Sequence, residues 1–199
     1  MKHNKEDIID KGIELMRKQG YHGTGVQQVL KACHIPKGSF YHFFESKQDF
    51  ALQAIEKYAQ DNIEELEQII SSNKLKPSGK LKRFFNNLMR FYRSQNYEMT
   101  CLMSIISFEM GATDPKIASR IENKFNIIKS LLTGVIREGQ EVKEIRDDID
   151  ARDLADYLIN SFNGALITMK YEQSDRAIRQ FQKISLSFLA FKLATNNKS

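Results

Sequence analysis

Apolar residues recur at helical spacing along almost the whole chain, and only three prolines occur in it. Pro36, Pro77 and Pro115 each stand near the start of a periodic segment. A helix tolerates proline there because its first turn has no use for the missing amide donor. No stretch sustains the alternation of apolar and polar residues that marks a half-buried strand. The sequence therefore predicts an all-α fold of about nine helices.

Glycines, prolines and polar clusters set the boundaries of the periodic segments. Thr24 is expected to cap the second helix, and Ser46 is expected to cap the fourth. We expect a three-helix domain at 1–48, a connecting helix from about 47, and a larger helical domain at 49–199. The expected helices cover residues 5–19, 25–33, 36–43, 47–71, 79–94, 97–110, 115–139, 151–172 and 175–195.

Composition argues against a membrane or secreted protein. Of the 199 residues, 41% are hydrophobic and 28% are charged, which is enough apolar material for a substantial core. No apolar run approaches the roughly 20 residues that a membrane-spanning helix needs. The first seven residues are mostly charged or polar and lead directly into a helical pattern, unlike a signal peptide. We expect a cytoplasmic protein.

Motifs of catalysis and metal binding are absent from the sequence. The two cysteines, Cys33 and Cys101, form no disulfide framework, and no cysteine–histidine spacing resembles a zinc site. The chain has no glycine-rich phosphate loop and no nucleophile elbow. We therefore expect neither an enzyme nor a metal or cofactor. An all-helical enzyme and a helical scaffold protein remain the alternatives from other classes.

The positive charge is concentrated toward the N-terminus. The formal net charge is +5, and residues 1–48 hold eight Lys and Arg against five Asp and Glu, which gives +3. The remaining residues hold 22 against 20, which gives +2, and all four histidines lie in the first segment. Such a surface is suited to face phosphate groups.

Residues 36–47 read Pro-Lys-Gly-Ser-Phe-Tyr-His-Phe-Phe-Glu-Ser-Lys and combine several aromatic rings with two lysines. A helix-turn-helix places its second helix in the major groove of DNA, while neighbouring groups hold phosphates. Gly38 would let the backbone approach DNA closely, Tyr41 and His42 would project polar atoms, and Lys47 would reach a phosphate. Periodicity alone leaves open that these are ordinary surface residues. Three rings are expected to pack inward: Phe40, Phe43 and Phe44.

Residues 20–50 resemble the N-terminal signature of the TetR family of transcriptional regulators. The resemblance rests on Gly-Tyr-His-Gly-Thr at 20–24, on Lys-Gly-Ser-Phe-Tyr-His-Phe-Phe at 37–44, and on Ser-Lys at 46–47. It is specific over about 45 residues, whereas the rest of the chain agrees in the number and length of its helices. One departure is Gly25, where the family commonly has Thr or Ser.

The resemblance implies a sequence-specific transcriptional repressor. It would be a homodimer whose two three-helix domains at 1–48, here called the heads, bind a palindromic operator in double-stranded DNA. By matching positions, contacts to backbone phosphates are expected from Thr24, Tyr41 and Lys47. Contacts to base edges are expected from Lys37, Gly38 and Ser39, with Gln27 or Gln28 nearby. A lysine at a base edge favours guanine, and each good base contact contributes roughly 1–3 kcal/mol of discrimination.

The helices at 151–172 and 175–195 have wide apolar faces. In this family the equivalent pair packs against its symmetry mate as a four-helix bundle, so the resemblance implies that the homodimer forms here. Ser161, Gly164 and Ala165 would allow close helix approach. The alternative is that these small residues fit the core of the single chain.

Cys101 stands in Thr-Cys-Leu-Met-Ser-Ile-Ile-Ser-Phe-Glu, which resembles a Gly-Cys-Leu…Glu motif in the TetR branch that includes the N-ethylmaleimide-reductase repressor. Residues 160–170 resemble the eighth helix of members of the same branch. That branch is associated with sensing electrophiles or small unsaturated acids. The resemblance implies that Cys101 is a sensor thiol whose pKa Lys170 lowers, and that oxidants act through a sulfenic acid. Thr100 departs from the glycine usual there.

Two other interpretations of the effector region stay open. The sequence is equally compatible with Cys101 as a buried structural thiol, in a repressor that binds its ligand reversibly and without covalent chemistry. Cys33 is expected to be packed. The Phe and Met side chains of the second domain suit an apolar effector cavity or an ordinary core. The effector residues that we expect beside Cys101 and Lys170 are Met103, Phe108 and Phe162.

Overall fold

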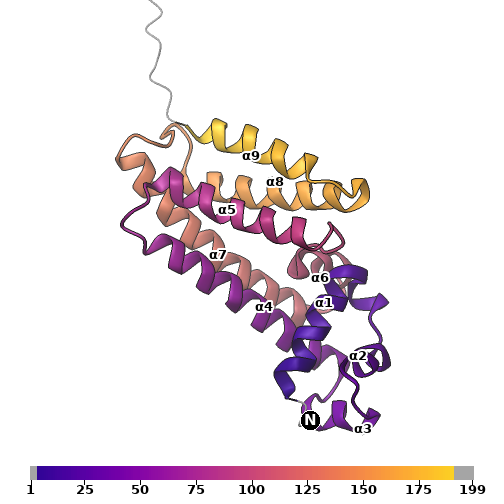
Figure 1. The fold of residues 1–199 in the computed structure, drawn as a ribbon. Coiled ribbons are helices and arrows are strands. Elements are labelled where there is room, and N and C mark those ends of the chain that lie inside the picture. Colours follow the sequence, from indigo (N-terminus) through magenta and orange to yellow (C-terminus); the bar gives the residue numbers. More distant parts are fainter. Residues whose placement is uncertain (1–3, 191–199) are drawn as a thin grey trace, which may run out of the picture. The chain divides into compact units, whose positions relative to one another are not determined.

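The computed structural model describes residues 4–190, except for the side chains of Lys37 and Ser39. Within that range the chain forms nine helices and no strand longer than an isolated bridge, which confirms the predicted all-α fold (Figure 1). The helices are α1 Lys5–Gly23, α2 Val26–Cys33, α3 Lys37–Phe43, α4 Lys47–Ile70, α5 Pro77–Ser94, α6 Leu102–Met110, α7 Pro115–Glu141, α8 Ala151–Glu172 and α9 Arg176–Leu189.

Side-chain caps fix several helix starts. The Asn4 side chain accepts from the Glu6 amide at 3.3 Å and so caps α1. Ser46 caps α4 as predicted, because its Oγ accepts from the Asp49 amide at 3.0 Å. The predicted Thr24 cap of α2 is wrong, since Gly25 occupies the cap position and has no side chain to offer.

Helix α6 begins later than the predicted segment 97–110. Asn96 and Tyr97 adopt φ angles of 49° and 62°, in the left-handed region, so the chain makes a turn there and the helix starts at Leu102. Cys101 becomes its N-cap residue. At the other end of the chain α9 stops at Leu189, and residues 191–195 of the predicted last helix lie outside the described residues.

The contacts divide the chain into two compact units. Unit 1 holds the residues up to 65 together with 95–127, and unit 2 holds 66–94 together with the residues from 128 on. Helices α4 and α7 each contribute to both units. The functional division into 1–48 and 49–199 stays a prediction. None of the described helices is both long and apolar enough to cross a membrane.

Three phenylalanines hold the N-terminal helices of unit 1 together. Phe40 and Phe44 lie 4.9 Å apart between ring centroids, and Phe50 lies 5.3 Å and 4.9 Å from them. These three rings are fully buried, which confirms the inward packing predicted for Phe40 and Phe44, whereas Phe43 is half-buried. Helix α1 lies directly on this cluster, because a Cβ at Gly12 would approach the Phe50 ring to 2.0 Å.

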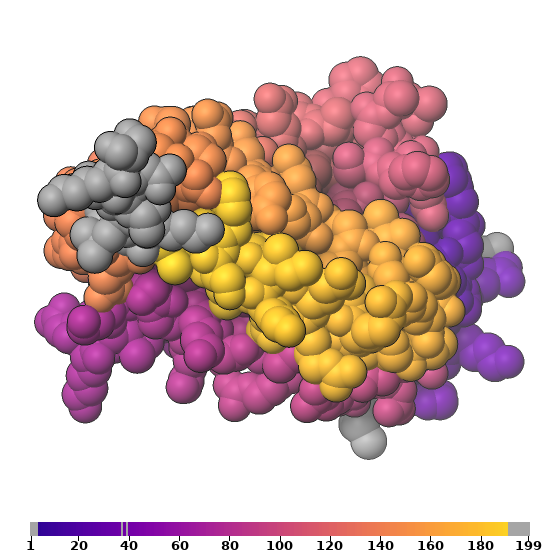
Figure 2. All heavy atoms as spheres, turned by 90° about the horizontal axis from the view of Figure 1, so that it is seen from above, coloured from indigo at the N-terminus to yellow at the C-terminus, as the bar shows by residue number. Residues whose placement is uncertain are grey.

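A second aromatic cluster forms the core of unit 2. The ring of Phe162 lies 5.3 Å from that of Phe85 and 5.3 Å from that of Phe181, and Phe85 and Phe181 are 4.9 Å apart. These contacts join α5, α8 and α9, which run side by side in Figure 1. Their outer side, formed by α9 and the adjoining part of α8, lies at the surface in Figure 2.

Candidate nucleic-acid interface and effector region

Helices α2 and α3 are joined by a tight turn. His34 adopts a φ of 56° and ends α2, with its amide donating to the Lys31 carbonyl at 3.2 Å. The Ile35 amide donates to the Leu30 carbonyl at 3.1 Å, and the buried Ile35 side chain anchors the turn. The backbone therefore makes a helix-turn-helix, in which α3 is the second helix.

The outer surfaces of α2 and α3 are open to a partner. Gln27, Gly38, Tyr41 and His42 are exposed, and 59% of the Tyr41 surface is accessible. A Cβ at Gly38 would meet nothing within 4 Å, so this position leaves room for a close approach. All four residues were predicted from the sequence to lie on the DNA-binding surface. The side chains of Lys37 and Ser39, which are expected to contact base edges, are outside the described part of the chain.

Two of the residues expected to contact phosphate are engaged within the chain. Thr24 is buried, and its hydroxyl donates to the Gly20 carbonyl at 2.7 Å. A phosphate contact from this hydroxyl would require that bond to exchange, because its single proton is already used. The Lys47 ammonium lies 4.2 Å from the Tyr21 ring centroid. Desolvation lowers the pKa of Lys47, while the charge of Glu109 acts in the opposite direction.

The two glutamines of α2 differ in their surroundings. Gln28 exchanges two hydrogen bonds with Gln19 of α1, at 2.7 Å and 3.2 Å. Gln27 is exposed and makes no side-chain hydrogen bond to another described residue. Of the two candidates for a contact near the base edges, Gln27 is therefore the one whose side chain would be available to a partner without the loss of a hydrogen bond to Gln19.

Glu109 on α6 was not assigned a role from the sequence. Its carboxylate accepts from the His22 amide at 2.9 Å, although 87 positions separate the two in the chain. It also lies against Gly20, where a Cβ would approach Glu109 Oε1 to 1.9 Å. Gly20 has a φ of 83° and a ψ of 174°, a conformation that is essentially restricted to glycine. This contact ties the end of α1 to α6.

A second connection joins α1 to the residue before Cys101. The Thr100 amide donates to the Arg17 carbonyl at 3.2 Å, and Arg17 Nε donates to the Thr100 carbonyl at 2.8 Å. The Arg17 guanidinium is buried and lies 5.0 Å from the Tyr58 ring centroid on α4. Helix α6 is thus bonded to α1 at both of its ends.

The residues expected to sense an effector fall into both units. Cys101 is 8% exposed in unit 1, and Met103 is buried beside it on α6. Phe108 is 93% exposed, so its ring lies outside the packed interior of unit 1. Lys170 and Phe162 belong to unit 2, where Phe162 fills the aromatic core. The pairing of Cys101 with Lys170 stays a prediction.

Cys33 differs from Cys101 in its surroundings. It lies at the end of α2, is only half-buried, and places its Sγ 4.0 Å from the Asp7 carbonyl. Burial raises the pKa of the Cys33 thiol, because desolvation disfavours the thiolate, and this outweighs the opposite effect of Lys11. At neutral pH this thiol is therefore a poor nucleophile.

Comparison with known proteins identifies both parts of the chain. Residues 8–54 match the family model described as bacterial regulatory proteins, tetR family, and residues 77–184 match that of the tetracyclin repressor-like C-terminal domain. The HTH-type transcriptional repressor DhaR of Mycobacterium sp. strain GP1 is 29% identical over 195 residues, which are 98% of this chain and 96% of DhaR.

Two solved structures have the same fold. The regulatory protein TetR from Rhodobacter sphaeroides superposes with a TM-score of 0.89 at 27% identity, covering 93% of this chain and 98% of that one. Escherichia coli NemR in its reduced form gives a TM-score of 0.84 at 20% identity, covering 94% and 97%. With its helix-turn-helix and with family matches over both parts, the chain belongs to the TetR family of DNA-binding transcriptional regulators.

Proposed function

We propose that the chain is a homodimeric repressor that binds a palindromic operator through its two heads. A small effector that binds in the region around Cys101, or modifies it covalently, releases the repressor from the DNA. Lys37, Gly38 and Ser39 face base edges in this proposal, and Tyr41 and His42 lie at the adjoining backbone. The exposure of Gly38, Tyr41 and Gln27 on α2 and α3 supports this surface.

An apolar face on α8 and α9 supports the homodimer. On α8, Ile167 is 66% and Tyr171 72% exposed, and on α9 Ile184 is 54% exposed. Large exposed apolar side chains on two neighbouring helices are typical of a surface that a partner covers. Gly164 lies in the same stretch, and a Cβ there would meet nothing within 4 Å, which leaves room for a close partner helix. A second copy of the chain would bury these side chains.

The observation that carries the effector proposal is the double hydrogen bond between Thr100 and Arg17. Cys101 is the next residue after Thr100, so an adduct at its sulfur has to displace the first turn of α6 in a close-packed interior. That displacement strains both bonds to α1. Because α1 lies directly on the Phe50 cluster that holds α3, the strain reaches the DNA-binding surface.

Replacing Cys101 with Ser should abolish release by electrophiles. When N-ethylmaleimide alkylates the thiolate, the sulfur adds to the carbon–carbon double bond and solvent supplies the proton. On treatment, we expect the protein with its native sequence to be released from operator DNA and the Cys101→Ser variant to stay bound. Cys33→Ser is the matched control and should behave like the unmodified chain. Operator release is followed by fluorescence anisotropy, and the alkylated residue is identified by mass spectrometry.

Equal release of the unmodified chain and of Cys101→Ser would remove this thiol from the mechanism. The specific alternative is a non-covalent effector with Cys101 as a structural thiol, which the 8% exposure of the cysteine favours. In that case unreactive analogues of the same size, such as N-ethylsuccinimide, would release both proteins alike. The Lys170 pairing is tested separately, because Lys170→Ala should slow alkylation of Cys101 if the ammonium stabilises its thiolate.

A further inference from the structure

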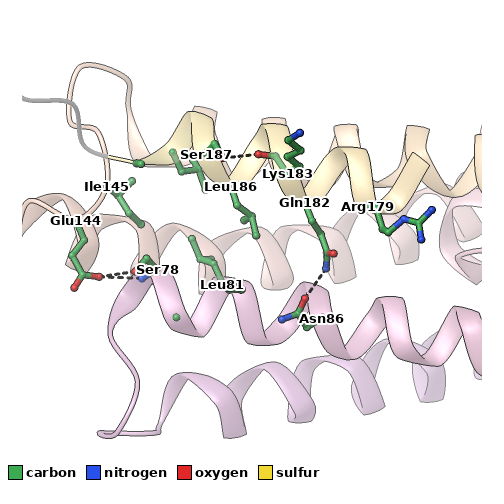
Figure 3. A pocket seen from close by; sticks show the side chains of 14 residues that line it. Ser78, Leu81, Asn86, Glu144, Ile145, Arg179, Gln182, Lys183, Leu186 and Ser187 are labelled. Carbon is green, nitrogen blue, oxygen red and sulfur yellow. Dashed lines mark hydrogen bonds between the residues drawn. The ribbon is translucent and has the colours of Figure 1, made fainter. Parts of the chain in front are cut away.

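A groove lies between α5 and α9 in unit 2, whereas Cys101 and the helix-turn-helix belong to unit 1. It has a volume of about 730 Å³, which falls within the usual range of small-molecule sites. Leu81 and Leu186 point toward one another across it in Figure 3, and Ile145 closes one end. The floor of this α5–α9 groove is therefore apolar.

The two walls of the α5–α9 groove carry only positive charge. The sequence of α5 contains five Lys and Arg, that of α9 contains three, and neither contains Asp or Glu. Part of this charge is neutralised by neighbours, since Arg179 pairs with Asp175 at 3.1 Å. Lys82 on α5 and Lys183 on α9 line the groove and form no ion pair with any described residue.

A hydrogen bond fixes how the two walls face one another. Gln182 Nε2 donates to Asn86 Oδ1 at 2.9 Å across the groove, as Figure 3 shows. Lys183 follows Gln182 directly, and Lys82 precedes Asn86 by four residues, about 6 Å along the helix axis. Lys82 on α5 and Lys183 on α9 therefore lie within about one helical turn of this bond along their helices, and both line the groove.

The acidic residue of the groove lies at its other end and is already engaged. Glu144 accepts from Ser78 Oγ at 2.9 Å and pairs with Lys76 at 3.2 Å. The Ser78 hydroxyl and then Lys76 hold the pKa of Glu144 below its ordinary value, against the opposing effect of desolvation. Among the described residues the negative charge of the groove is thus confined to one end, and an apolar floor adjoins two lysines that pair with no described carboxylate.

We propose that the α5–α9 groove binds an amphipathic organic anion, an aliphatic carboxylate of medium chain length. Lys82 and Lys183 hold the carboxylate from opposite walls, and the aliphatic chain lies on Leu81 and Leu186. Charge complementarity favours this occupant, because an uncharged apolar molecule leaves both ammonium groups unused. A small inorganic anion leaves the apolar floor open to water. The site is independent of Cys101 and of the proposed release mechanism.

A single tryptophan can report on this groove, since the chain contains none. Gly79 lines the groove, and a Cβ there meets only Leu75, at 3.9 Å, so Gly79→Trp places the indole at the edge with little strain. Titration of the full chain with decanoate, below its micelle-forming concentration, should give a saturable change in fluorescence. Decanol has the same tail without charge and acetate has the charge without the tail, so both should bind at least tenfold more weakly.

Charge reversal tests the assignment of the head group. Lys82→Glu with Lys183→Glu, in the Gly79→Trp background, should weaken decanoate binding by about tenfold or more, since two charge-assisted contacts become repulsive. Lys74→Glu with Lys116→Glu changes net charge equally at exposed positions outside the groove and should leave binding unchanged. Melting curves by circular dichroism verify folding, and Lys82→Gln and Lys183→Gln replace any variant that fails to fold. Binding that is absent, equal for decanol, or unaffected at Lys82 and Lys183 would overturn the proposal.

Discussion

Replacing Ile167 and Ile184 together with Glu should convert the dimer into monomers that bind the operator roughly 10²–10⁴-fold more weakly. Both side chains are more than half exposed on the apolar face of α8 and α9, where a second copy would bury them. Two carboxylates per protomer would have to be desolvated opposite their symmetry mates. Each head would then bind its half-site alone, without the effective concentration that linkage provides. Sedimentation and operator anisotropy at fixed salt measure the two effects.

Val142→Glu is the matched control for this experiment. Val142 is 58% exposed in unit 2 but lies beyond the end of α7 and outside the α8–α9 face. This variant should remain dimeric and keep its operator affinity. If the Ile167/Ile184 double variant also stays dimeric, another surface forms the dimer.

Gly20→Ala should destabilise the chain by about 2–5 kcal/mol, the other large effect that we expect. The φ of 83° and ψ of 174° at Gly20 cost a residue with a Cβ about 1–3 kcal/mol. The new methyl group would also displace the Glu109 carboxylate, which stands 1.9 Å from its position, and so break the bond to the His22 amide. A charge-assisted hydrogen bond contributes about 1.5–3 kcal/mol, less where it is exposed. Urea unfolding measures the loss.

Gly23→Ala provides the comparison, three residues further along the same helix. A Cβ at Gly23 meets only the side chain of Gln19, at 3.5 Å, and the φ of this residue is not in the left-handed region. Its stability should change by less than about 1 kcal/mol. Equal effects of the two substitutions would mean that neither the strain at Gly20 nor its contact with Glu109 matters.

Most of the helical framework was predictable because local signals determine it. Helix 151–172 has the predicted bounds, and α7 ends within two residues of its prediction, since apolar periodicity and a leading Pro115 suffice to place them. The start of α6 was not predictable in the same way. Asn96 and Tyr97 adopt left-handed conformations that few non-glycine residues take up, and their local sequence carries no glycine to signal the turn.

The connections around the candidate site were beyond sequence reasoning for another reason. Arg17 and Thr100 are 83 positions apart, and Glu109 and His22 are 87 apart, so only the packed fold brings them together. The exposed positions on α3 were predictable because the helix-turn-helix pattern is local. Thr24 shows the limit of that pattern, since its hydroxyl bonds to Gly20 and is buried at a position where a phosphate contact was expected.

A footprint on the DNA upstream of this chain's own gene, with protein stoichiometry and salt titration, tests the repressor proposal most directly. We predict protection of a palindromic site by two protomers, with the logarithm of affinity falling linearly with the logarithm of salt concentration. Two-fold symmetry of the site should mirror that of the dimer. Protection of no palindrome there, or a complex with a single protomer whose affinity is insensitive to salt, would contradict a dimeric operator-binding repressor.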